Sequence, residues 1–173
     1  MRHSIWGTGN ALLITLSITF IANAQTPSAV TTPRCSSAEY RQFDFWLGEW
    51  DVTQNGKIAG RNNIRSILNG CAISEEWSGA GGFKGTSLNF YDAASKRWHQ
   101  TWIDSQGQSL SLDGQLEGSS MVLQSAGADG TRHKITWTPI DDKTVRQLWQ
   151  VQNAAGSEWK TLFDGRYARA SPR

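Results

Sequence analysis

Charge, histidine, cysteine and proline are all scarce in this chain of 173 residues, and each shortage excludes a class of protein. The 17 lysines and arginines face 15 acidic residues and form no basic run, so we expect no nucleic-acid partner. A charged fraction of only 18% excludes a charge-rich disordered protein. Four prolines exclude a proline-rich chain. Three histidines and two cysteines without a C-x-x-C spacing predict no metal site.

Sequence motifs of common enzymes and cofactor-binding proteins are also missing. The chain contains no G-x-S-x-G, no P-loop, no G-x-G-x-x-G and no H-E-x-x-H. We therefore expect no cofactor, and the sequence alone does not indicate a reaction. Tryptophan is abundant instead, with nine residues, and the positions of these residues carry most of the argument.

The first 24 residues have the pattern of a secretory signal peptide. A basic start at Arg2 and His3 precedes a mostly apolar run over 11–22 and a small-x-small cleavage site, Ala22-Asn23-Ala24. The alternative is a membrane anchor, but the apolar run is short for a bilayer and no basic cluster follows it. We therefore predict a secreted protein without a membrane anchor, in the bacterial periplasm, whose mature chain begins at Gln25.

Both cysteines lie after the predicted cleavage site. Export leads to an oxidising compartment, so Cys35 and Cys71 are expected to form one disulfide. Two free buried thiols are the alternative.

The mature chain is predicted to be all-β. A leader and one short helix over 36–42 make up 25–42, and a single domain follows over 43–170. Turn pairs such as Asn55-Gly56 separate short alternating runs, so neighbouring strands should be antiparallel. Such a meander should close into an up-and-down barrel, because the competing two-sheet sandwich leaves exposed edges. The ten expected strands are 49–54, 60–68, 71–78, 84–92, 96–104, 108–117, 119–125, 131–139, 143–152 and 157–168.

Alternation along each strand assigns a face to the tryptophans. Leu110, Leu112 and Leu116 share one face of their strand and identify it as the inward one. The same reasoning predicts that the barrel interior holds Trp50, Trp77, Trp98, Trp102, Trp137, Trp149 and Trp159. The strand over 84–92 is ambiguous, because Ser87, Asn89 and Tyr91 alternate with Leu88 and Phe90.

The tryptophans either fill the barrel as a solid core or form the walls of a cavity. Polar residues on the same faces favour a cavity, because buried polar groups need partners and aromatic pockets with a few polar groups are typical small-molecule sites. The leading hypothesis is a small apolar or aromatic ligand. The candidate ligand-binding residues are Glu75, Trp77, Asn89, Tyr91, Trp98, Gln100, Trp102, His133, Trp137, Gln147 and Trp149.

Two alternatives remain open. A hydrolase or isomerase would use Glu75 as acid or base, with its pKa raised by burial beside Trp77 and with His133 as a partner across the lumen. Against catalysis stands a salt bridge from Glu75 to Arg146 or Arg65. The third hypothesis is an interaction module with a solid core, including a homodimer formed by outer apolar residues. These outer residues are Leu88, Phe90, Ile103, Leu148 and Leu162.

The run Phe43-Asp44-Phe45-Trp46-Leu47-Gly48-Glu49-Trp50 resembles the opening of a group of secreted bacterial proteins of uncharacterised activity. Later runs resemble the same group from about 43 to 169. The Gly48-Glu49-Trp50 tripeptide is more distantly similar to the G-x-W signature of calycins, which include the lipocalins. That resemblance implies a barrel that binds small molecules. Nitrobindin-like calycins hold haem through a late histidine, whereas the last expected strand here has none.

Overall fold

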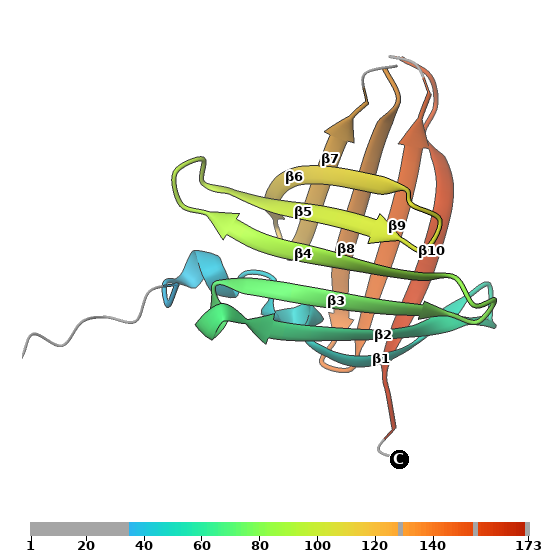
Figure 1. Ribbon diagram of the computed structural model, residues 1–173, viewed down its shortest axis with the longest axis horizontal. Helices are drawn as coiled ribbons and strands as arrows, with labels where there is room; N and C mark the ends of the chain where they lie inside the picture. The colour runs from blue at the N-terminus through green and yellow to red at the C-terminus, as the bar shows by residue number, and fades with distance from the viewer. Residues whose placement is uncertain (1–34, 128–129, 154–155, 172–173) are drawn as a thin grey trace, which may run out of the picture. The chain divides into compact units, whose positions relative to one another are not determined.

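The computed structural model describes residues 35–127, 130–153 and 156–171. The predicted signal peptide and nearly all of the predicted leader lie outside these residues. Ten antiparallel strands follow one another around a closed barrel, and β1 completes the ring by pairing with both β2 and β10 (Figure 1). This confirms the predicted fold class. The strands are β1 (Gly48–Gln54), β2 (Lys57–Ile67), β3 (Ala72–Gly79), β4 (Lys84–Asp92), β5 (Arg97–Asp104), β6 (Ser109–Glu117), β7 (Ser120–Ala126), β8 (Arg132–Asp141), β9 (Thr144–Gln152) and β10 (Lys160–Arg169).

Short turns connect the strands, as the turn residues predict. Asn55 and Gly56 both have positive φ, at 50° and 73°, which suits the tight turn between β1 and β2. In Figure 1, β3 to β6 run across the barrel in front, and β7 to β10 cross behind them at a steep angle. Strands of a closed barrel must tilt in this way, and the tilt leaves an interior between the two walls.

Within the described residues, three short 3-10 helices accompany the barrel: η1 (Ala38–Arg41), η2 (Asp44–Trp46) and η3 (Leu68–Gly70). The predicted helix over 36–42 is present as η1. The segment from η1 to η2 fills one end of the barrel, where Phe43 stacks on Trp46 with ring centroids 4.9 Å apart. Trp98 Nε1 also donates to Gln42 Oε1 over 3.1 Å. We call this segment, residues 38–46, the plug.

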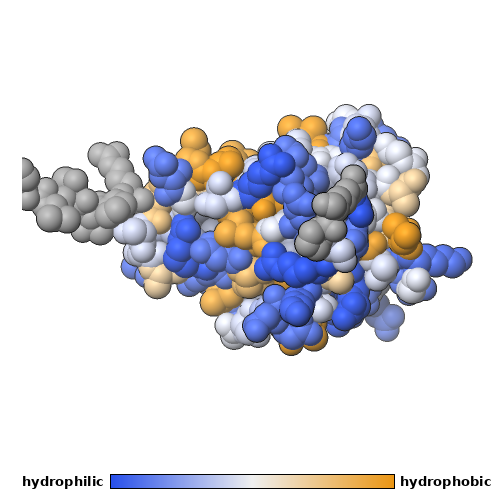
Figure 2. Space-filling view, turned by 90° about the horizontal axis from the view of Figure 1, so that it is seen from below, coloured by the Kyte–Doolittle hydropathy of each residue, from blue (hydrophilic) through white to orange (hydrophobic). Residues whose placement is uncertain are grey.

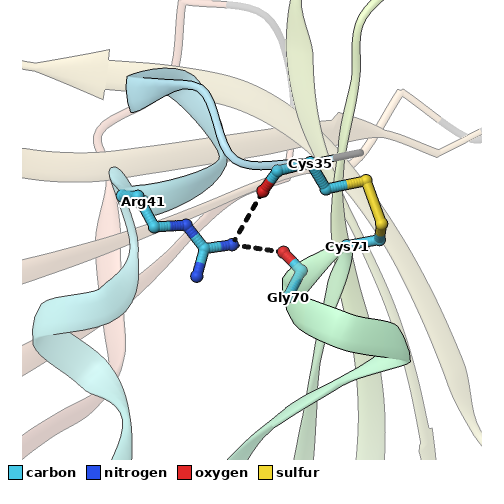
Figure 3. Close-up of a disulfide and its surroundings, with 4 residues drawn as sticks. All are labelled: Cys35, Arg41, Gly70 and Cys71. Atoms are coloured by element: carbon cyan, nitrogen blue, oxygen red, sulfur yellow. Dashed lines mark hydrogen bonds between the residues drawn. A yellow bond between two sulfur atoms is a disulfide. The ribbon is translucent and has the colours of Figure 1, made fainter. Parts of the chain in front are cut away.

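The plug is fastened to the barrel by a disulfide. Cys35 and Cys71 are bonded, as predicted, and join the residues just before the plug to the residue that follows η3 (Figure 3). Arg41 Nη2 lies between the same two segments and donates to the carbonyl oxygens of Cys35 and Gly70 (Figure 3). A covalent bond and a charge-assisted hydrogen bond therefore hold the same junction.

The half of the barrel next to the plug has a solid core. Trp46, Trp50, Trp98 and Trp137 are each at most 2% exposed, and Phe43 lies against three of them. Indole rings bury a large apolar area, so this cluster is a main contributor to stability. A solid core, one of the two alternatives for the interior, is thus present, but it occupies only part of the interior.

Among the tryptophans that the structure describes, Trp159 lies outside the barrel, contrary to the alternation. Trp159 precedes β10. Lys134 Nζ and Arg132 Cζ lie over its ring, 4.6 and 5.9 Å from the ring centroid. The predicted strand began at residue 157, but β10 begins at Lys160, and its register against β9 shifts between Thr161 and Phe163. An irregularity of this kind breaks the period of two on which the prediction depended.

The structure also resolves the ambiguity in the fourth strand. Ser87 and Asn89 are buried, whereas Leu88 is 42% exposed on the outer face. Ile103 is also exposed, while Phe90 is partly covered by stacking on His99. Leu162 is exposed as well, but it lines the cavity of the barrel, contrary to the prediction that it lies on the outer face. On the face that Figure 2 shows, hydrophobic side chains form separate patches among hydrophilic ones.

Candidate functional site

A cavity of about 390 Å³ occupies the barrel end opposite the plug. The turn between β3 and β4 lies at its mouth, where Ala80, Gly81 and Phe83 are exposed lining residues. The volume falls at the lower end of the range of about 300–1,000 Å³ that is typical of small-molecule sites. The cavity therefore has room for a small organic molecule.

Aromatic side chains form most of the cavity wall. Trp77 projects from β3, Trp102 from β5, Trp149 from β9, and Phe163 and Tyr167 from β10. Trp77 and Phe163 meet edge to face, with ring centroids 6.2 Å apart. Leu110 and Ile135 complete the wall.

Two glycines let the aromatic rings lie flat against the strands. A Cβ atom at Gly85 would lie 2.1 Å from Trp102 Cζ2, and one at Gly165 would lie 2.3 Å from Phe163 Cε1. Such distances are far below van der Waals contact, so any larger residue would force these rings to move. The missing side chains therefore help to set the width of the cavity.

The polar floor of the cavity centres on Glu75. This side chain is 5% exposed, and its two carboxylate oxygens accept hydrogen bonds from different strands. Asn62 Nδ2 donates to Oε1 over 2.7 Å, and Ser87 Oγ donates to Oε2 over 2.6 Å. The floor is thus built where β2, β3 and β4 lie side by side.

Further amide groups extend this network to both sides. Asn89 Nδ2 donates to Ser87 Oγ over 2.9 Å, and Gln100 Nε2 donates to Asn89 Oδ1 over 2.8 Å. On the other side, the hydroxyl of Tyr167 donates to Gln147 Oε1. Gln100, Gln147 and Tyr167 all line the cavity, so the network reaches the space that a ligand would fill.

Glu75 has no basic partner among the described residues. The expected salt bridge to Arg146 is wrong, because Arg146 pairs with Asp164 on the outer face over 2.7 and 2.8 Å. Arg65 is exposed and lies opposite Ser74 of β3, on the alternate face of that strand. Burial raises the pKa of the Glu75 carboxyl, and its hydrogen bonds from Ser87 and Asn62 oppose that rise.

Tyr167 is the titratable neighbour of Glu75. Burial and the nearby Glu75 carboxylate raise the pKa of the Tyr167 phenol well above its usual value of 10.0. The phenol is therefore a neutral hydrogen-bond donor at ordinary pH. Its donation to Gln147 fixes that amide in one orientation.

The predicted pair of Glu75 and His133 is not formed. Trp149 Nε1 donates to His133 Nδ1 over 3.1 Å, which holds the imidazole against the cavity wall. The carboxyl of Glu75 instead accepts hydrogen bonds from Asn62 and Ser87. His133 thus has a supporting position behind Trp149.

Six of the predicted site residues line the cavity and five do not. Asn89 lies beneath the floor, fully buried, and His133 lies behind Trp149. Tyr91 and Trp98 lie at the plugged end, where the ring centroids of Tyr91 and Tyr40 of η1 are 5.2 Å apart. Trp137 belongs to the solid core. The six lining residues are Glu75, Trp77, Gln100, Trp102, Gln147 and Trp149.

Several residues of the cavity wall and of the hydrogen-bonded network around Glu75 were absent from the predicted set. Alternation along the last strand places Phe163 and Tyr167 on the same face as Trp159, but the predicted set of ligand-binding residues did not include them. Phe83 lies in a turn, and Asn62 follows Arg61 in β2, so neither stands out in the sequence. Ser87 was recognised only on an ambiguous strand.

Neither a metal cluster nor a membrane-spanning helix is found in the part of the chain that the structure describes. No group of three or more potential metal ligands gathers there. No helix there has the length and apolarity to cross a bilayer. No protein-family model matches the chain, and no curated protein shows significant similarity to it. The function must therefore be inferred from the sequence and the geometry of this chain.

Proposed function

We propose that the chain is a secreted, calycin-like barrel that binds a small molecule in its tryptophan-lined lumen. The observation that carries the proposal is the polar floor at the base of an aromatic cavity. Glu75, Gln100 and Gln147 meet there beneath indole walls. Apolar walls supply binding area, and a few placed polar groups orient the ligand.

The hollow end distinguishes this proposal from an interaction module with a solid core. Gly85 and Gly165 leave room for the rings of Trp102 and Phe163 to lie close to the strands. The buried carboxyl of Glu75 lies at the floor of a cavity that reaches the surface. A barrel with only a structural role would bury more apolar area by filling this space. A homodimer built on the outer apolar residues remains a separate proposal, tested by size-exclusion chromatography with light scattering.

Blocking the cavity tests the proposed function. Leu110 lines the cavity from β6, whereas the next residue, Ser111, is exposed on the outer face. We expect 2-phenylethanol, a neutral aromatic probe, to quench the tryptophan fluorescence of the wild-type protein saturably. Leu110→Trp should abolish the quenching and Ser111→Trp should retain it. Equal quenching of both variants would contradict binding in the lumen.

Native mass spectrometry of gently purified protein complements this titration. A stoichiometric small molecule that is lost in Leu110→Trp would support the proposal and identify the natural ligand. The same spectra test the proposed secretion, since removal of the signal peptide leaves a protein with the mass of the mature chain that begins at Gln25. An uncleaved mass from an exporting host would contradict it.

Catalysis in the lumen is the second candidate, favoured by one observation. Glu75 is a buried carboxyl at a cavity floor, and burial raises its pKa toward the range of a general acid or base. Its hydrogen-bonding partners, Asn62 and Ser87, do not titrate. A Glu75→Gln variant that binds a substrate without turning it over would establish catalysis. Equal turnover by both proteins would exclude Glu75 as the acid or base.

A further inference from the structure

We propose that the cavity selects organic cations, small molecules in which an ammonium group with N–H donors is attached to an apolar body. This inference rests on the proposed function, because it names the ligand class of the same cavity. Three features carry it: the direction of the hydrogen bonds on the floor, the unpaired charge of Glu75, and the aromatic walls.

On the β4 and β5 side of the floor, the hydrogen bonds between side chains run toward Glu75. Gln100 Nε2 donates to Asn89, and Asn89 Nδ2 donates to Ser87. Ser87 Oγ then donates to one carboxylate oxygen, while Asn62 Nδ2 donates to the other. Both side chains that bond the carboxyl therefore act as donors to it, which is the arrangement that stabilises its ionised form.

This arrangement leaves acceptors for a ligand. The side-chain amide nitrogen of Gln100 donates to Asn89, and this orients the amide oxygen of Gln100 away from that bond. The Gln100 oxygen has no hydrogen-bond partner within the described ranges, so it can accept a hydrogen bond from a ligand. Each oxygen of Glu75 has a further lone pair beyond the one that Asn62 or Ser87 uses. Both residues line the cavity, so the floor offers acceptors from two side chains.

The charge of Glu75 lacks a counterion in the described part of the chain. The ion pairs there join other residues, all with substantially exposed side chains. A buried carboxylate without a cation is costly, and a ligand that brings a cation into the cavity removes that cost. A carboxylate ligand would add a second negative charge, and a neutral acceptor would leave the floor oxygens unpaired.

The walls favour the same charge. Trp77, Trp102 and Trp149 line the cavity around the floor. The π systems of indole rings attract ammonium groups, and desolvation inside a cavity strengthens that attraction. Because the whole chain has a formal charge of +2, its overall charge does not draw cations to the surface. Selectivity for cations would therefore have to come from the cavity.

Three probes of similar size and different charge test this inference. We expect 2-phenylethylamine to bind the wild-type protein at least tenfold more tightly than 2-phenylethanol at pH 7.5, measured by isothermal titration calorimetry. The anion 3-phenylpropanoate should bind more weakly than the alcohol. Glu75→Gln should remove the preference for the amine. Glu76→Gln, which changes the adjacent exposed carboxyl on the outer face, should retain the preference.

The outcomes separate the ligand class from the proposed function. Equal affinities of amine and alcohol, both abolished by Leu110→Trp, would overturn cation selectivity and leave lumen binding in place. An amine preference that survives Glu75→Gln would overturn the assignment to Glu75. Failure of all three probes to bind would overturn both proposals. If Glu75→Gln fails to fold, the comparison of the probes on the wild-type protein still decides whether cations are preferred.

Discussion

Replacing Glu75 by glutamine should change how the stability of the barrel depends on pH. The folded state raises the pKa of the Glu75 carboxyl above its usual value of 4.5, chiefly because the group is buried. Between 4.5 and the folded pKa, the folded protein retains a proton that the unfolded chain releases. The free energy of unfolding must then fall as pH rises through this window, and it levels off above the folded pKa.

The size of the effect follows from one proton. The slope contributed by a single group cannot exceed about 1.4 kcal/mol per pH unit. Glutamine has nearly the same shape, can accept from Asn62 and can donate to the hydroxyl of Ser87. We therefore expect Glu75→Gln to fold and to lose this component of the slope.

Urea denaturation between pH 4.5 and 8, followed by tryptophan fluorescence, measures the difference directly. The stability of the wild-type protein minus that of Glu75→Gln should decrease as pH rises, because contributions of other groups cancel in the difference. Tyr167 does not interfere, since its pKa lies well above 10.0. A difference that is flat, or that increases with pH, would refute the account of Glu75 as a buried and unpaired acid.

Two further predictions concern the wall and the plug. In the same urea assay, Gly85→Ala should lower the free energy of unfolding by about 1–3 kcal/mol, because the new Cβ would displace the Trp102 ring. The control Gly81→Ala adds a Cβ with no atom within 4 Å, so it should change the free energy of unfolding by less than about 0.5 kcal/mol. Replacing Cys35 and Cys71 by alanine should cost about 2–5 kcal/mol in thermal or urea unfolding, and an unchanged midpoint would show that the plug is held without the disulfide.

The sequence was sufficient to predict the strands, because alternation and turn chemistry are local properties. Strand order follows from the short turns, and closure follows from the need to cover the edges of β1 and β10. The disulfide also followed, since the sequence contains only two cysteines. The error at Trp159 has a local cause as well, namely the irregular start of β10.

The height of a residue along the barrel could not be read from alternation. Trp98 and Trp102 share a face of β5, yet the first belongs to the solid core and the second lines the cavity. The difference depends on which end the plug occupies, and that is a long-range property. The floor depends similarly on strand register, which places Ser87 opposite Glu75 and brings Asn62 within reach of the same carboxyl.

The seam between β1 and β10 has a consequence for the order of events during synthesis. Trp50 pairs with Arg169, so the ring closes only when nearly the last described residue is available. A growing chain that has released β1 to β9 still has two unpaired strand edges, which can join other chains. The barrel therefore cannot close until β10 has been synthesised, and a chain that stops before β10 should aggregate instead of folding to a smaller barrel.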